Sequence, residues 1–142
     1  MNDSEGPFRF DTRAVVVVRD DLAAWQELNV TAFLSTGLAA DASLLGEPYV
    51  DADGTVYAAM LREPIMVRVA PAAELAAIRA AAVGRGLRTA VYTADLFTTT
   101  HDAANRAAVA AVSGAELDLV GVAVHGAKNA VDRVTKRATL HP

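Results

Sequence analysis

The chain has 142 residues, enough for one domain, and its 53% hydrophobic and 21% charged residues exclude a disordered or fibrous protein. Thirteen basic against seventeen acidic residues give a net charge of -4, which argues against unspecific binding to a phosphate backbone. Because cysteine is absent, disulfides, thiolate metal sites and cysteine nucleophiles are excluded.

The first residues, 1–13, form a polar N-terminal segment without the apolar core of a signal peptide. Residues 14–142 are interpreted as a single α/β domain. No apolar run approaches the roughly 20 residues that span a bilayer. We therefore expect a cytoplasmic protein without membrane partners.

A strand buried on both faces is predicted for Val15–Val18, since an unbroken β-branched run is typical of a central strand in a sheet covered by helices. Helical spacing follows from Asp21 to Gly37, with Asp20 or Asp21 as its cap. The apolar stripe of this helix consists of Trp25, Leu28, Ala32 and Phe33.

A hairpin is predicted next, because Asp53-Gly54 between Tyr49-Val50 and Val56-Tyr57 tolerates the positive φ angles of a tight turn. The stretch Asp51–Gly54 is similar to a calcium loop, but its glycine stands at the fourth position instead of the sixth. We therefore interpret this stretch as a turn.

Strands and helices alternate in the rest of the chain. Further strands are predicted at Ile65–Val69, Thr89–Thr93 and Leu117–Val124. Helices are predicted from Pro71 to Gly84–Gly86, at Asp102–Val112 and at Ala130–Val134. This order predicts an α/β fold, a single-domain three-layer α/β/α sandwich with a mixed β-sheet.

The richest polar segment, Asp95–Asp102, leaves a strand and enters a helix, where ligands of α/β sheets usually bind. The candidate catalytic residues in it are Asp95, Thr99 and His101. Asp95 or His101 could position a water against a carbonyl, and Thr99 could stabilise the oxyanion.

A purely structural interpretation of this segment stays open. Thr99 or Thr100 would cap the helix, and Asp102 would pair with Arg106 four residues later. The consecutive Thr100, His101 and Asp102 do not form a catalytic triad, since neighbours on a helix point to different sides.

Candidate ligand-binding residues are expected at the same edge of the sheet. They are Arg19, Asp21, Gln26, Asn29 and Asn105. Asn105 follows His101 by four residues, so both share a helix face. Asn29 interrupts the apolar stripe, where an amide without a partner would cost a few kcal/mol, so it either is satisfied within the core or contacts a ligand.

No metal and no cofactor are expected. The histidines at 101, 125 and 141 lack metal-ligand spacing, and Gly84 with Gly86 forms no phosphate-binding loop. The one candidate for a phosphate contact is a basic cluster that consists of Lys128, Arg133, Lys136 and Arg137.

Several motifs resemble the type II peptidyl-tRNA hydrolase fold. The valine strand that ends in Arg19-x-Asp21-Leu22 is similar to the opening of that fold. Asp95 with Thr99 four residues later resembles its Asp-Ala-Gly-x-Thr segment, and Val131–Thr135 resembles its closing Ile-Asp-x-Val-Thr.

The chain resembles more closely a bacterial domain-of-unknown-function family, number two thousand, that shares this fold. The motifs of this second resemblance are Trp25-Gln26-x-Leu28-Asn29, Tyr49-x-Asp51, Asn105-Arg106 and Leu117-x-Leu119-Val120-Gly121. Together the motifs extend over Ala14–Leu140.

The resemblance implies the fold and, as in type II relatives, a homodimer, but the Gly-Lys pair at the start of the first helix is replaced by Trp25–Asn29. Phe97 likewise replaces the glycine after the aspartate. We therefore expect a cleft that binds a small polar molecule or a peptide end. The alternatives are a hydrolase of peptidyl-tRNA or a related aminoacyl ester, with tRNA as a partner, and a homodimeric interaction module.

Overall fold

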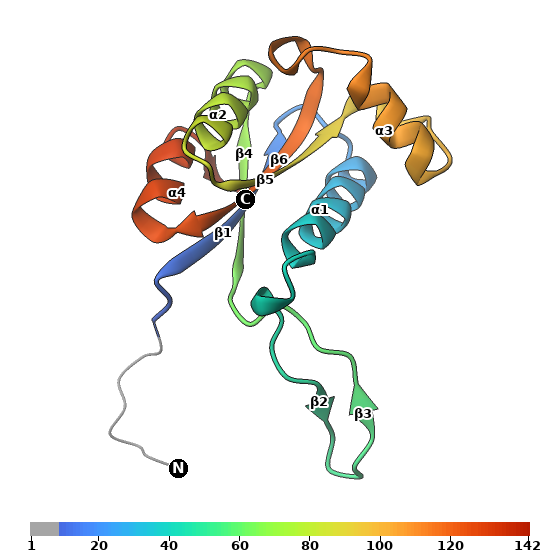
Figure 1. The fold of residues 1–142 in the computed structure, drawn as a ribbon, viewed down its shortest axis with the longest axis vertical. Helices are drawn as coiled ribbons and strands as arrows, with labels where there is room; N and C mark the ends of the chain where they lie inside the picture. Colours follow the sequence, from blue (N-terminus) through green and yellow to red (C-terminus); the bar gives the residue numbers. More distant parts are fainter. Residues whose placement is uncertain (1–8) are drawn as a thin grey trace.

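Five strands form the central sheet in the order β5-β6-β1-β4-β7 in the computed structural model, which describes residues 9–142 (Figure 1). The strands are β1 (Thr12–Arg19), β4 (Ile65–Ala70), β5 (Arg88–Thr93), β6 (Leu119–Ala127) and β7 (Thr139–Leu140). β1 runs parallel to β4, and the other neighbouring strands are antiparallel. The predicted mixed sheet is therefore confirmed, with the valine strand in its centre.

Helices cover both faces of the sheet (Figure 1). α1 (Ala24–Ala39) packs on one face, and α2 (Ala72–Gly84) and α4 (Lys128–Thr135) pack on the other. Val15 and Val17 join the core under α2 and α4, whereas Val16 and Val18 join the core under α1. Since side chains alternate along a strand, the fully buried valine run serves two cores, as the three-layer prediction requires.

The remaining helix, α3 (Asp102–Ala110), follows β5 and lies on the same side as α1 (Figure 1). It is preceded by the short 3-10 helix η2 (Ala94–Phe97). None of the residues of α3 is buried. This exposed helix is one wall of the hollow described below.

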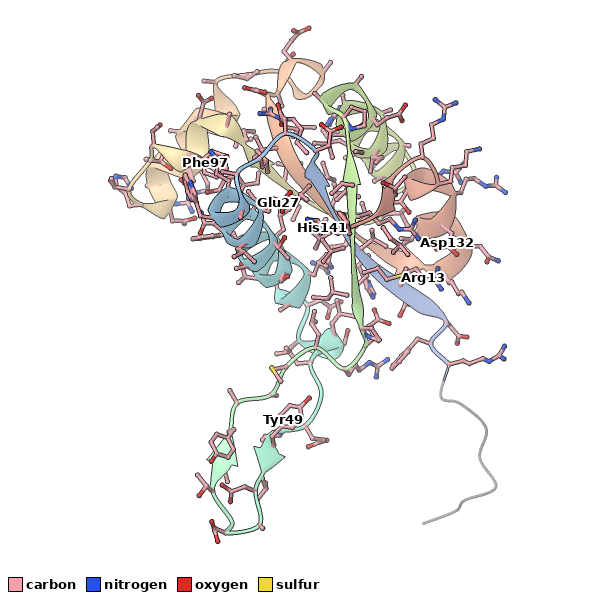
Figure 2. The ribbon with its side chains drawn as sticks, turned by 180° about the vertical axis from the view of Figure 1, so that it is seen from behind. Arg13, Glu27, Tyr49, Phe97, Asp132 and His141 are labelled. Carbon is pink, nitrogen blue, oxygen red and sulfur yellow. The ribbon has the colours of Figure 1, made fainter. Side chains whose placement is uncertain are left out.

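A hairpin arm, β2 (Tyr49–Val50) and β3 (Val56–Tyr57), extends away from the sheet and its helices (Figure 2). Its turn holds Gly54 at a φ of 86°, which confirms the predicted tight turn. Leu45 and Leu61 form an isolated bridge at the base of the arm. The aromatic and valine side chains of both strands are exposed.

The apolar stripe predicted for α1 is not the face of the helix that is buried. Trp25, Leu28 and Phe33 are 61%, 72% and 55% exposed, while the buried side chains are Val30, Leu34 and Leu38. The reason lies in the sheet, where a Cβ added at Gly121 would come within 2.4 Å of Val30 Cγ1. α1 sits so close to β6 that only slender aliphatic side chains fit between them.

The expected boundaries of α1 also need correction. Neither Asp20 nor Asp21 caps the helix, because Ala23 is the N-cap and its backbone N–H donates to Gln26 Oε1 at 3.0 Å. Gly37 does not end the helix, which continues to Ala39. At Gly37 an added Cβ would lie 2.8 Å from Ala90 Cβ, so the glycine permits close packing on β5.

At the N-terminus, the predicted polar segment of residues 1–13 lies mostly outside the described residues. β1 begins within that segment, at Thr12. Further along, β6 runs past the predicted end at Val124 to Ala127, and α4 includes the predicted helix Ala130–Val134. Arg13 at the start of β1 pairs with Asp132 of α4 at 2.6 Å, which ties the two elements together (Figure 2).

Candidate functional site

A hollow of about 570 Å³ opens between α1, α3 and the end of β5. Most of its wall is apolar and comes from side chains such as Phe33, Tyr92, Leu96 and Val109. Its polar lining residues are Thr36, Asp102, Asn105 and Arg106. An apolar hollow of this size with a few polar groups is the usual form of a small-molecule site.

Asn105 is the predicted ligand-binding residue that lines this hollow. The hydroxyl of Thr99 lies 3.1 Å from the Leu96 carbonyl oxygen and also donates to Asn105 Oδ1. The amide oxygen of Asn105 is thereby occupied. Its Nδ2 has no hydrogen-bond partner within residues 9–142, so this N–H donor is available to a ligand.

Asn29 does not line the hollow itself but contacts Tyr92, which does. Its Nδ2 donates to the Tyr92 hydroxyl at 3.2 Å, which confirms that the amide inside α1 finds a partner. Burial raises the pKa of the Tyr92 phenol, and the hydrogen bond from Asn29 offsets part of that rise. Tyr92 is therefore protonated at neutral pH, and the described residues provide no acceptor for its O–H group.

Four aromatic rings connect α1 with η2 beside this hollow. The ring centroids are 5.6 Å apart for Trp25 and Phe97, 5.2 Å for Phe97 and Tyr92, and 6.0 Å for Tyr92 and Phe33. Figure 2 shows Phe97 near the first turns of α1. The end of β5 and the first half of α1 thus border a common region, as the predicted site requires.

The other residues of the polar segment have local structural partners. His101, and not Thr99 or Thr100, is the N-cap of α3, and its Nδ1 accepts from the Ala104 N–H at 3.2 Å. Asp102 and Arg106 form the predicted ion pair at the surface. The His101 side chain therefore stabilises the start of α3 and does not line the hollow.

Asp95 lies at the start of η2 with an exposed side chain. Across the described part of the chain, its carboxylate makes no hydrogen bond and no ion pair. Only its backbone carbonyl is engaged, by the N–H and the hydroxyl of Thr98, the latter at 2.9 Å. The carboxylate is therefore accessible, one turn away from Thr99.

Arg19, Asp21 and Gln26 lie apart from the hollow. Arg19 Nε pairs with Asp21 at 2.5 Å, and its Nη1 pairs with Asp118 at 3.2 Å. Gln26 is used in capping α1. The structure thus brings Asn29, Thr99 and Asn105 to the hollow, directly or through one contact. By contrast, Arg19, Asp21 and Gln26 contact residues near the end of β1 and the start of α1 and do not line it.

The family model described as "Protein of unknown function (DUF2000)" matches residues 12–142. The chain belongs to this family. A solved structure of a protein of unknown function from Agrobacterium tumefaciens strain C58 is 41% identical to this DUF2000 member, with a TM-score of 0.90. The match covers 94% of this chain and 100% of that one. The comparison with curated proteins found no match.

The resemblance to the domain-of-unknown-function family is therefore confirmed. The resemblance to the type II peptidyl-tRNA hydrolase fold stays a prediction. Between residues 9 and 142, no helix is long and apolar enough to cross a membrane. In the same range, no three His, Cys, Asp or Glu side chains come together in a group that could hold a metal ion.

A buried polar cluster that the sequence did not predict lies at the opposite end of the α1 face. Thr12 Oγ1 donates to Glu63 Oε2 at 2.7 Å, and the other carboxylate oxygen of Glu63 contacts His125 Nε2. Glu63 and His125 are 6% and 9% exposed. Beside them in the sheet, Arg88 is the register partner of His125 and pairs with Asp41 at 3.4 Å.

Only one signal in the sequence pointed to this cluster. His125 ends the apolar run of β6, so its side chain had to be either exposed or paired. Its partner Glu63 stands 62 residues earlier, two residues before the start of β4. Because β1 separates β4 from β6 in the sheet, the pairing depends on strand order and not on any spacing in the sequence.

Proposed function

We propose that the hollow between α1 and α3 binds a small molecule that has an apolar body and a carboxylate or carbonyl end. The observation that carries this proposal is the gathering of N–H and O–H donors around an otherwise apolar cavity. A peptide C-terminus with an apolar last side chain is one ligand of this chemical class.

Three donors define the polar end of the ligand. Thr99 occupies the amide oxygen of Asn105, so Asn105 presents its N–H group. The guanidinium of Arg106 has five N–H donors, of which Asp102 uses a part. Tyr92 contributes its O–H group. An acceptor with two oxygens matches these donors, and a carboxylate matches Arg106 best.

The apolar part of the ligand would lie against Phe33, Leu96 and Val109. Burying apolar surface there supplies binding free energy of about 25 cal/mol per Å². A purely polar ligand would gain little from these walls. We therefore propose an amphipathic ligand in place of the small polar molecule expected from the sequence.

The test is a thermal-shift screen of carboxylates with aromatic or branched aliphatic bodies, followed by calorimetric titration of the best one. A ligand at about 100 times its Kd should stabilise the fold by about 2.7 kcal/mol. We expect Asn105→Asp to weaken binding by about tenfold or more, because it keeps the acceptor for Thr99 but places a negative charge beside the carboxylate.

Two controls accompany this titration. Asp95→Asn changes an exposed carboxylate outside the lining of the hollow and should leave the affinity unchanged. Val109→Trp should fill the hollow and abolish binding while the protein stays folded, since Val109 is only half-buried. Equal affinity of the wild type and Asn105→Asp would reject this site.

A second candidate function is hydrolysis of peptidyl-tRNA or a related aminoacyl ester. It is supported by the resemblance to the type II peptidyl-tRNA hydrolase fold and by the accessible carboxylate of Asp95 one turn from Thr99. Asp95 would position the attacking water, and Thr99 or Asn29 would hold the carbonyl.

Release of the peptide from a peptidyl-tRNA tests this candidate directly. A hydrolase predicts release by the wild type and a loss of about 100-fold or more in Asp95→Asn. Release that is absent, or equal in both proteins, would reject Asp95-dependent hydrolysis. The binding proposal stands or falls separately, through Asn105→Asp.

A further inference from the structure

A second hollow, of about 210 Å³, lies between α2 and α4 on the opposite face of the sheet. Its charged lining residues are Glu74, Arg85, Arg133, Lys136 and Arg137. We propose that this hollow binds a small polyanion that carries two or more phosphate groups. This site shares no lining residue with the hollow between α1 and α3.

Three of the four cations in this hollow lack counter-ions among the described residues. Arg137 pairs with Glu74 at 3.5 Å, but Arg85, Arg133 and Lys136 form no ion pair within residues 9–142. Elsewhere in the described chain, Arg13, Arg19, Arg88 and Arg106 pair with acidic side chains. The other basic residues without an ion pair in residues 9–142 are Arg9, Arg62, Arg68, Arg79 and Lys128, and they do not line this hollow. In a protein with a net charge of -4, clustered cations without partners repel one another, and a bound anion would relieve this repulsion.

Helix geometry explains how the cations converge. Arg133 lies in the last turn of α4, Lys136 is the C-cap residue and Arg137 follows it, so the three cations gather at the C-terminal end of this helix. Arg85 is the C-cap residue of α2, across the hollow from them. The helix macrodipole stabilises a cation at the C-terminus of each helix. It does not explain why the cations of two helices line the same hollow.

The shape of the hollow favours a compact ligand over a long phosphate chain. Ala77 and Ala81 line the α2 side, so the space between the cations is open. Glu74 lies among the cations, and its carboxylate would repel a phosphate placed next to it. Guanidinium groups bind phosphate oxygens in a bidentate way, so Arg85 and Arg133 together match two linked phosphates.

The basic cluster predicted from the sequence is therefore correct in three residues and wrong in one. Lys128 lines a different hollow, together with Arg9 and Arg13, and Arg85 takes its place. This exchange provides a matched control, because Lys128 lies on the same helix as Arg133 and carries the same charge.

Calorimetric titration with inorganic pyrophosphate and inorganic phosphate tests the proposal. We expect pyrophosphate to bind the full chain at least about tenfold more tightly than phosphate, because it engages more than one cation. Arg133→Gln and Arg85→Gln should each weaken pyrophosphate binding by about tenfold, whereas Lys128→Gln should leave it unchanged. Circular dichroism of each variant establishes that it is folded.

Three results would overturn the proposal. One is the absence of pyrophosphate binding at millimolar concentration, and another is an equal loss in Lys128→Gln and Arg133→Gln, which would show a general charge effect. The third is a single-stranded oligonucleotide that binds more tightly than pyrophosphate through the same residues, since it would assign the surface to a nucleic acid. Asn105→Asp should not change any of these titrations.

Discussion

The contact between Glu63 and His125 joins two buried polar side chains, so the loss of one partner should be costly. Both groups are buried, and Thr12 completes the hydrogen bonding of the carboxylate. Glu63→Ala leaves the imidazole and the Thr12 hydroxyl without this partner. We expect it to lower the free energy of unfolding by about 3–5 kcal/mol, measured by urea denaturation.

Glu47→Ala is the matched control for this prediction. Glu47 has the same charge but is exposed in the chain before the hairpin arm. Its removal should change the free energy of unfolding by less than about 0.5 kcal/mol. If the two variants lost equal stability, the buried pair would contribute nothing beyond a surface charge.

His141 provides a prediction about pH. Its pKa is raised above the ordinary 6.5 by the hydrogen bond to the Pro142 carbonyl and then by Glu27 of α1, whose carboxylate lies 2.8 Å from Nε2 (Figure 2). The stabilisation that this contact provides is fully present below pH 6.5 and is lost as the pH rises through the raised pKa of the folded state.

An NMR titration of the His141 imidazole measures this pKa. Glu27→Gln should lower it, because the second cause of the rise is removed, while Glu47→Gln should leave it unchanged. A His141 pKa at or below 6.5 in the wild type would contradict the contact with Glu27.

At the residue scale, local spacing predicted local contacts only. The pair of Asp102 and Arg106 is confirmed, since four residues on a helix determine it. The need of Asn29 for a partner was also predicted, but Tyr92 as that partner follows from the packing of α1 on β5. The roles proposed for Asp95, Thr99 and His101 stay predictions.

Among the elements, α1 packs closely on the sheet at Gly121. Besides its 2.4 Å approach to Val30, a Cβ at Gly121 would lie 2.9 Å from Leu34 Cδ1. Gly121→Ala should therefore cost about 1–3 kcal/mol in urea denaturation, because the core beneath α1 is overpacked.

Gly84→Ala tests the opposite case with the same chemical change. Gly84 is the last residue of α2, and a Cβ there would meet no atom within 4 Å. Its replacement should be neutral or stabilise the protein by up to about 1 kcal/mol, because alanine restricts the unfolded chain. A loss of stability as large as that of Gly121→Ala would contradict this packing argument.

The error at α1 shows why element types were predictable and the buried face was not. Aliphatic residues at Val30, Leu34 and Leu38 recur every four positions and fit the helix as well as the aromatic stripe does. Hydrophobicity alone favours the aromatic residues. Which face of α1 is buried depends on Gly121 of β6, which lies far away in the sequence and leaves room only for narrow side chains.

For the whole molecule, the valine strand makes the two cores depend on each other. Val16 and Val17 are adjacent and fully buried, but they belong to cores on opposite faces. Val16→Ala and Val17→Ala should each lower the free energy of unfolding by about 2 kcal/mol.

Unfolding of these two variants should remain a single transition when it is followed by tryptophan fluorescence and by circular dichroism. Trp25 reports on the α1 side, whereas circular dichroism reports on all elements. Transitions that separate in Val17→Ala would show that the two faces unfold independently.

The alternation of strands and helices predicted the layers, because each element type has its own hydrophobic period. The strand order could not be predicted, since β6 returns antiparallel between β1 and β5 and no local pattern encodes that placement. The two hollows depend on this order, as they form where helices from distant parts of the chain meet over the sheet.

The hairpin arm has one practical consequence. Its two stems meet at Leu45 and Leu61, so the chain departs from the body and returns to it at nearly the same point. A short glycine-containing linker could replace the intervening residues without moving η1 (Ala42–Leu44) or β4. The arm is therefore a natural insertion point for a tag or a reporter domain, at a distance from both hollows.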